Sequence, residues 1–132
     1  MKLKYRRAEI ADVQSVYRLV LQGTRRGKIL KRPVADIRKS IHHFWVAQDA
    51  GRTIACCALE IYNKKLAEIR SLVVEPSREK QGIATRLLEI CLKEAKKRKV
   101  YEVLAITDRD GIFRRHGFSE QLHGQKALFL RP

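Results

Sequence analysis

The sequence predicts an α/β protein with a mixed β-sheet flanked by helices, in the element order β-α-α-β-β-β-α-β-α-β. Short apolar runs that are typical of strands alternate with segments whose apolar residues recur at helical spacing. A strand at 66–74, a helix at 82–97 and a strand at 101–107 have the order of a right-handed crossover between parallel neighbours. The length of 132 residues and the apolar share of 45% fit a single domain spanning residues 1–132.

The first half of the chain is predicted to supply three strands and two helices. Residues 3–7, LKYRR, have the pattern of a short strand. A helix follows, then a polar, glycine-punctuated loop at 23–33, and then a short second helix marked by Ile37 and Ile41. FWVAQ and TIACCALEIY flank the turn DAGR and predict a β-hairpin. The residues at helical spacing in the first helix are Ile10, Val13, Val16, Tyr17, Val20 and Leu21.

The second half is predicted to complete the sheet around a long helix. The strand LAEIRSLVV ends in residues that are apolar on both faces, as expected in the middle of a sheet. YEVLAIT is the next strand, DRDGIFRRHGF a short helix ending near Gly117, and ALFL a closing strand. The long helix carries a broad apolar stripe formed by Ile83, Leu87, Leu88, Ile90, Cys91, Leu92 and Ala95.

Charge and composition narrow the class of protein. The formal net charge of +15 attracts polyanions such as nucleic acid, acidic membranes or phosphorylated cofactors. No apolar run reaches the roughly 18 residues of a membrane span, and the start MKLKYRRAEI lacks the apolar core of a secretory signal. We therefore expect a cytoplasmic protein without a membrane partner. The three cysteines and the adjacent His42 and His43 lack metal spacing, so we expect structural roles and no metal.

The segment VVEPSREKQGIATRLL predicts a phosphate-binding site. Pro76 ends the strand because it cannot donate to a ladder. The amides of residues 79–84 then open the long helix, and a helix N-terminus attracts anions. Gly82 and Ala84 keep the surface low enough for phosphate oxygens to reach the backbone. Side chains that can assist are Arg78, Lys80 and Thr85. The alternative is an ordinary strand–helix connection with a glycine for tight packing.

The residues Glu79-Lys80-Gln81-Gly82-Ile83-Ala84 resemble the acetyl-coenzyme A loop of the GNAT family of N-acetyltransferases. The family pattern is Gln/Arg-x-x-Gly-x-Gly/Ala. Glu79 departs from it, where a cation or an amide is usual, and Arg78 stands beside it. The segment IFRRHGF is similar to the family's F/Y-x-x-x-G-F, and the order of elements agrees over nearly the whole chain.

The resemblance implies a splayed central sheet, acetyl-coenzyme A (acetyl-CoA) as co-substrate, and no metal. The main chain of Leu72, Val73 and Val74 would bond the pantetheine arm, and the strand at 101–107 would diverge from that at 66–74 to leave a cleft for the thioester. Phe113 stands where many members have a tyrosine that protonates the departing thiolate. Water or Thr107 would then supply that proton.

A narrower resemblance concerns the acceptor. GKILKRP, HHFWVAQDAGRTIACCALEIY and LAEIRSLVVEP are similar to the stand-alone acetyltransferase domain of N-acetylglutamate synthases of arginine biosynthesis. The α-amine of glutamate is then the expected acceptor, Glu68 the general base, and Arg32 in a Leu-x-Arg motif the partner of a substrate carboxylate. Other substrate-binding candidates are Leu30, Arg70, Ser71 and Lys126. Related proteins often dimerise, so a homodimer is one of the oligomeric states that the sequence leaves open.

Two other functions stay open at this point. Small, strongly basic GNAT proteins acetylate macromolecular amines such as an aminoacyl-tRNA or a protein, and the charge of +15 suits a nucleic-acid partner. A non-catalytic binding module is the third possibility, because Glu79 and Phe113 both depart from the usual residues of the family. Each candidate residue also has a plain alternative: Glu68 as a paired strand carboxylate and Arg32 as a solvated cation.

Overall fold

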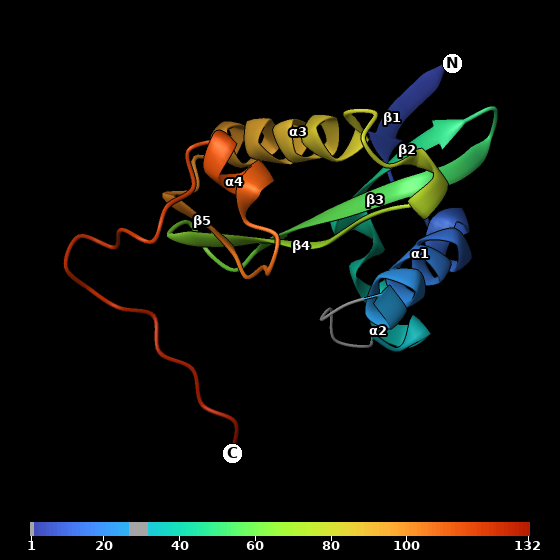
Figure 1. Ribbon diagram of the computed structural model, residues 1–132. Helices are drawn as coiled ribbons and strands as arrows, with labels where there is room; N and C mark the ends of the chain where they lie inside the picture. The colour runs from blue at the N-terminus through green and yellow to red at the C-terminus, as the bar shows by residue number, and fades with distance from the viewer. Residues whose placement is uncertain (1, 27–31) are drawn as a thin grey trace.

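The computed structural model describes residues 2–26 and 32–132. Its strands are β1 (Leu3–Arg7), β2 (Phe44–Asp49), β3 (Arg52–Ile61), β4 (Leu66–Val74) and β5 (Glu102–Ala105), and its α-helices are α1 (Val13–Arg26), α2 (Val34–Ser40), α3 (Ile83–Lys97) and α4 (Gly111–Arg115) (Figure 1). Short 3-10 turns at Ile10–Asp12, Ile41–His43 and Pro76–Arg78 lead into α1, β2 and the loop before α3.

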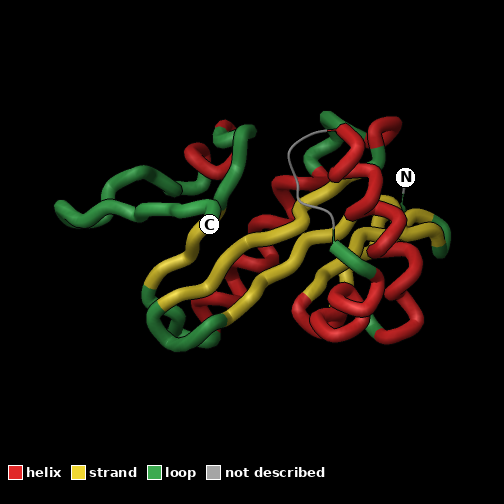
Figure 2. Tube along the Cα trace, turned by 90° about the horizontal axis from the view of Figure 1, so that it is seen from below, coloured by secondary structure: helices red, strands yellow, loops and turns green. Residues whose placement is uncertain are grey.

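The sheet has five strands in the order β1-β2-β3-β4-β5, which Figure 2 shows side by side. Neighbours from β1 to β4 are antiparallel, and β4 and β5 are parallel. The parallel pair is joined through α3, so the predicted crossover and the mixed sheet are confirmed.

Two cores lie on opposite faces of this sheet, below α3 and above α1 and α2 in the view of Figure 1. Leu87, Leu88 and Cys91 of α3 pack on one face, and Leu19 and Ile37 of α1 and α2 pack on the other. Alternate strand residues point to opposite faces, so β3, the middle strand, contributes side chains to both cores. The three cysteines are buried and form no disulfide.

The predicted closing strand ALFL is wrong. Residues after Phe118 form no strand, and Leu128, Phe129 and Leu130 are 86%, 74% and 86% exposed. A strand needs a neighbour for its N–H and C=O groups, and this segment runs away from the sheet (Figure 1). The predicted strand at 101–107 is also shorter, because its pairing with β4 ends at Ala105.

A β-bulge interrupts β4 at Ser71. Cys56 pairs with Val73, but Ala58 pairs with Arg70, so β4 carries one more residue than β3 between these pairs. Ser71 has φ of 54°, the left-handed conformation that a non-glycine residue seldom adopts. A bulge bends its strand and redirects a side chain, here at the point where β5 leaves β4.

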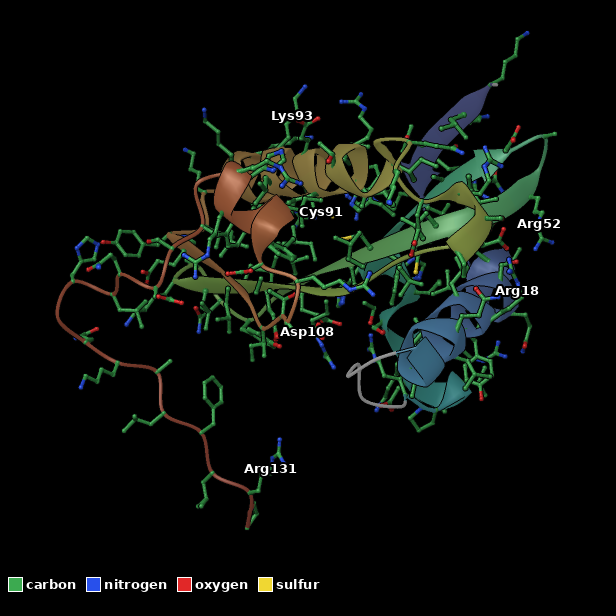
Figure 3. All side chains as sticks on the ribbon, viewed as in Figure 1. Arg18, Arg52, Cys91, Lys93, Asp108 and Arg131 are labelled. Carbon is green, nitrogen blue, oxygen red and sulfur yellow. The ribbon has the colours of Figure 1, made fainter. Side chains whose placement is uncertain are left out.

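Glu75, which follows β4, fixes the start of the loop before α3. Its Oε1 accepts hydrogen bonds from Nη1 of Arg18 and Nη2 of Arg52, each 2.6 Å long, and both arginines are labelled in Figure 3. Burial raises the pKa of Glu75, but the hydrogen bonds and charges of the two arginines outweigh it and hold that pKa below its ordinary value.

Replacing Glu75 by Gln is expected to lower the free energy of unfolding at pH 7 by about 2 kcal/mol, because two guanidiniums lose their shared carboxylate. The lowered pKa means that this stabilisation is present above the unfolded value near 4.5 and is lost as pH falls through the folded value. Urea unfolding of both proteins at pH 7 and at about pH 3 checks this, since the difference between them should shrink in acid. An equal difference at both pH values would contradict the prediction.

Candidate active site

The cleft between β4 and β5 lies where the two strands diverge. Their pairing begins at Leu66 and Glu102 and ends at Ile69 and Ala105. Residues 70–74 of β4 therefore pair only with β3, and their other edge has no partner in β5. The predicted splay is confirmed. An edge without a partner strand is one that an extended ligand can bond through main-chain groups, and this role of Leu72 to Val74 stays a prediction.

The loop before α3 presents an uncapped helix N-terminus. The first helical hydrogen bond runs from the N–H of Arg86 to the carbonyl of Gly82 at 3.0 Å, and Gly82, the N-cap residue, has no side chain with which to cap the helix. The amides at 83–85 therefore lack acceptors within the helix. Gly82 has φ of 80°, and a Cβ placed there would meet no atom within 4 Å. The space beside Gly82 is open, and together with these amides it fits a pyrophosphate.

The predicted cofactor residues contribute to this loop in different ways. Arg78 binds Asp49 at the end of β2, with Nη1 2.9 Å from Oδ2, and its Nε donates to Oε1 of Gln81 at 3.4 Å. These contacts tie the loop to the sheet. Lys80 is exposed and has φ of 64°, whereas the side chain of Ile83 is buried in the core below α3. Three other loop residues predicted to bind the cofactor are half-buried: Glu79, Ala84 and Thr85.

Phe113 and Thr107 line one cavity of about 340 Å³ between β5 and α4. Phe113 is 7% exposed and packs edge-to-face on Phe118, with ring centroids 5.2 Å apart. The hydroxyl oxygen of Thr107 accepts a hydrogen bond from the N–H of Arg109 at 2.9 Å, which leaves the hydroxyl proton available for donation. Asp108, beside it in the lining, is labelled in Figure 3.

Arg32 lies buried against the bulge. It is 9% exposed, Nη1 donates to Oγ of Ser71 at 3.1 Å, and Nη2 donates to Oγ of Ser40 at 3.1 Å. Its guanidinium stacks over the ring of Phe44 at 5.7 Å. Burial lowers the pKa of Arg32, and the neighbouring charge of Arg70 lowers it further. Arginine nevertheless stays charged in proteins. A buried positive charge therefore lies within hydrogen-bond distance of the Ser71 hydroxyl.

Two carboxylates face each other across β3 and β4. Glu60 pairs directly with Glu68, and the pairing places both side chains on one face of the sheet. Glu68 accepts a hydrogen bond from the hydroxyl of Tyr62 at 2.6 Å. Oε2 of Glu60 lies 2.9 Å from Nδ1 of His43, and its Oε1 lies 3.9 Å from Nη2 of Arg32. Burial and the bond to Glu68 raise the pKa of Tyr62.

The structure thus brings most of the predicted acceptor residues together. Arg32, Ser71, Arg70 and Glu68 surround the bulge, and the sequence reasoning missed Ser40, His43, Glu60 and Tyr62 in the same network. Period-two alternation at the end of β3, continued to Tyr62 just after it, could have placed Glu60 and Tyr62 on one face, but it could not supply the register with β4. Leu30 lies outside the described residues. Lys126 is exposed on the segment that runs away from the sheet (Figure 1).

Neither a metal centre nor a membrane helix is present in the described part of the chain. Residues 2–26 and 32–132 contain no group of three or more His, Cys, Asp or Glu side chains that could hold a metal ion. No helix among them is both long and apolar enough to cross a bilayer.

A family model described as "Acetyltransferase (GNAT) domain" matches residues 40–120, which contain the splay, the bulge and the loop before α3. The chain belongs to the GNAT acetyltransferase family. This GNAT protein is an acetyl-CoA-dependent N-acetyltransferase, and the fold around the cleft is that of its relatives.

Curated relatives agree with the family. The chain is 37% identical over 115 residues to an uncharacterized N-acetyltransferase of Chlorobaculum tepidum, covering 87% of this chain and 74% of the relative. It is 32% identical over 119 residues to an amino-acid acetyltransferase of Mycobacterium tuberculosis, covering 87% and 67%. It matches the amino-acid acetyltransferase of Escherichia coli at 27% identity and spans only 26% of that protein.

Solved structures agree with the fold. A Mycobacterium tuberculosis protein in complex with CoA and NLQ superposes with a TM-score of 0.83 at 30% identity, covering 89% of this chain and 72% of that one. The N-acetylglutamate synthase of Neisseria gonorrhoeae, complexed with CoA and N-acetyl-glutamate, superposes with a TM-score of 0.78 at 21% identity, covering 88% and 28%. The second likeness supports the fold of this chain and nothing finer.

Proposed function

We propose that this GNAT protein acetylates the α-amine of a free amino acid, with glutamate as the first acceptor to test and arginine biosynthesis as the setting. The observation that carries the proposal is the arrangement at the bulge, where Arg32, Arg70 and Glu68 lie beside the cleft between β4 and β5. Cations suit the carboxylate of an amino acid, and a carboxylate suits its amine. The relatives named amino-acid acetyltransferase support the same substrate class.

Binding of acetyl-CoA would use the two open backbone surfaces. The amides at 83–85 and Gly82, together with Lys80 and Gln81, would receive the pyrophosphate. The unpaired edge of β4 at Leu72, Val73 and Val74 would bond the pantetheine arm through main-chain groups. The thioester then lies at the bulge, between Ser71 and the cavity lined by Phe113 and Thr107.

The reaction would be a direct transfer. The amine nitrogen attacks the thioester carbonyl carbon, and Glu68 takes the proton that the nitrogen loses, directly or through one water. Backbone N–H groups of residues 72–74 would stabilise the oxyanion. The C–N bond forms first and gives the tetrahedral intermediate that bears this oxyanion. Its collapse restores the carbonyl and breaks the C–S bond, and the departing thiolate takes a proton from water or from the hydroxyl of Thr107. Phe113 cannot supply that proton because it has no acidic group.

Release of free thiol from acetyl-CoA, measured with a panel of amino acids, tests this proposal. Turnover with an α-amino acid that depends on Glu68 and Arg32 is the expected result. The three protein cysteines are all buried and should not contribute to the thiol signal. Binding of acetyl-CoA without turnover of any free amino acid would contradict the proposal.

A macromolecular amine is the second candidate, and a cluster of exposed cations favours it. These cations are Lys93, Lys96, Lys97 and Lys99, at the end of α3, and Figure 3 shows Lys93 pointing away from the sheet. Such a surface attracts nucleic acid with an affinity that falls steeply with salt. Acetylation of an aminoacyl-tRNA, in the absence of any turnover with free amino acids, would replace the first proposal by this one.

A further inference from the structure

We propose that Glu60 determines which amino acid the acceptor site prefers, by balancing the charge of Arg32. The site then favours an acceptor whose side chain is uncharged over one that carries a second carboxylate. This inference rests on the proposed transfer to the α-amine of a free amino acid, and it concerns the side chain of that acceptor.

The position of Glu60 makes its charge effective. Cys56 and Ala58 of β3 pack against α1 and α2, so alternation places Glu60 on the same face but further along β3. Its side chain is 12% exposed, and Nδ1 of His43 lies 2.9 Å from it. Oε1 lies 3.9 Å from Nη2 of Arg32. Charges at such low exposure are poorly screened by water.

The charged side chains named around the bulge are two cations and two carboxylates. Arg32 and Arg70 supply two guanidiniums, and Glu60 and Glu68 supply two carboxylates. An amino acid that is ready to react has a neutral amine and an α-carboxylate, and Arg70 is the cation next to Glu68 that can receive that carboxylate. Nδ1 of His43, a side chain that is 49% exposed, contacts the other oxygen of Glu60.

If Arg70 binds the α-carboxylate of the acceptor, a second carboxylate on its side chain would have to pair with Arg32. That guanidinium already donates to Ser40 and Ser71, and Glu60 lies beside it. The side-chain carboxylate of glutamate would therefore approach Arg32, whose positive charge Glu60 already balances, and it would be repelled by the negative charge of Glu60. The amide of glutamine has the same length and no charge, so it avoids this repulsion.

Initial rates with glutamate and glutamine at saturating acetyl-CoA test the inference. The wild-type protein should show the higher kcat/KM with glutamine. In Glu60→Gln, the ratio of kcat/KM for glutamate to that for glutamine should rise about tenfold, because Arg32 is then unbalanced. Glu89→Gln is the matched control, since it removes an exposed carboxylate of α3 on the opposite face of the sheet and should leave the ratio unchanged.

Several results would overturn the inference, and they can be told apart from a failure of the proposed function. A wild-type protein that prefers glutamate to glutamine would contradict it without any variant. A Glu60→Gln protein that binds acetyl-CoA normally but changes both acceptors by the same factor would also contradict it. If the wild-type protein acetylates no free amino acid, the proposed function itself is wrong and this inference falls with it.

Discussion

Replacing Glu68 by Gln should lower kcat about a hundredfold or more, while KM for acetyl-CoA changes little. The amide has nearly the same shape but cannot take the proton that the amine nitrogen loses on acetylation. Glu68 lies on β4 before the bulge, away from the loop that would hold the pyrophosphate, so the loss should appear in the chemical step. Steady-state kinetics of thiol release, with acetyl-CoA varied at saturating acceptor, give both constants.

The matched control for this prediction is Glu102→Gln. Glu102 is a half-buried carboxylate at the start of β5, paired with Leu66 at the opposite end of the β4–β5 contact from the splay. The same change there should leave kcat within about twofold of the wild-type value, as most substitutions away from the reacting atoms do. A Glu68→Gln protein with near wild-type kcat would exclude Glu68 as the general base.

The sheet, the helices and the loop before α3 could be predicted because local patterns specify them. The run LAEIRSLVV, the apolar stripe after Gly82 and the proline at 76 each have a local physical meaning as strand, helix and strand end. Consecutive parts of the chain also agree, since a strand, a helix and a strand of these lengths join as parallel neighbours. The proposed phosphate site at residues 79–84 is inferred from these same elements and stays a prediction.

The acceptor region could be predicted only in part, because it depends on cross-strand register. Nothing local marks Ser71 as the residue with positive φ, since serine adopts that conformation seldom. The bulge at Ser71 decides which residues of β3 face Arg70 and Glu68, so Glu60 could not be placed opposite Glu68 in advance. The resemblance supplied Arg32, but its bonds to Ser40 and Ser71 depend on how α2 meets the sheet.

The segment ALFL was predicted to be a strand that the structure does not form. Its apolar residues fit a strand when they are considered alone, yet no neighbouring strand completes their hydrogen bonds in the described structure. Strand formation is decided by pairing more than by propensity. The same consideration explains why β5 ends at Ala105, where β4 turns away through the bulge and pairing stops.

Replacing Gly82 by Asp should weaken acetyl-CoA binding about a hundredfold while the protein stays folded. Gly82 has φ of 80°, which aspartate tolerates better than most residues, and a side chain there meets no atom within 4 Å. A carboxylate at a helix N-terminus favours the helix, so it offsets part of the backbone strain. The same carboxylate would repel the pyrophosphate and compete for the amides at 83–85.

Gly51→Asp is the control that separates the effect of the added charge on CoA binding from the effect of backbone strain. Gly51 has φ of 84° in the turn between β2 and β3 and also has open space around its Cβ position. The two variants therefore bear the same backbone cost and the same added charge, and they differ in where that charge lies. Calorimetric titration with CoA should show near wild-type affinity for Gly51→Asp and strongly reduced affinity for Gly82→Asp. Equal affinities in the two variants would mean that the phosphates do not bind at the start of α3, because a carboxylate at Gly82 would then weaken binding no more than one in the turn between β2 and β3.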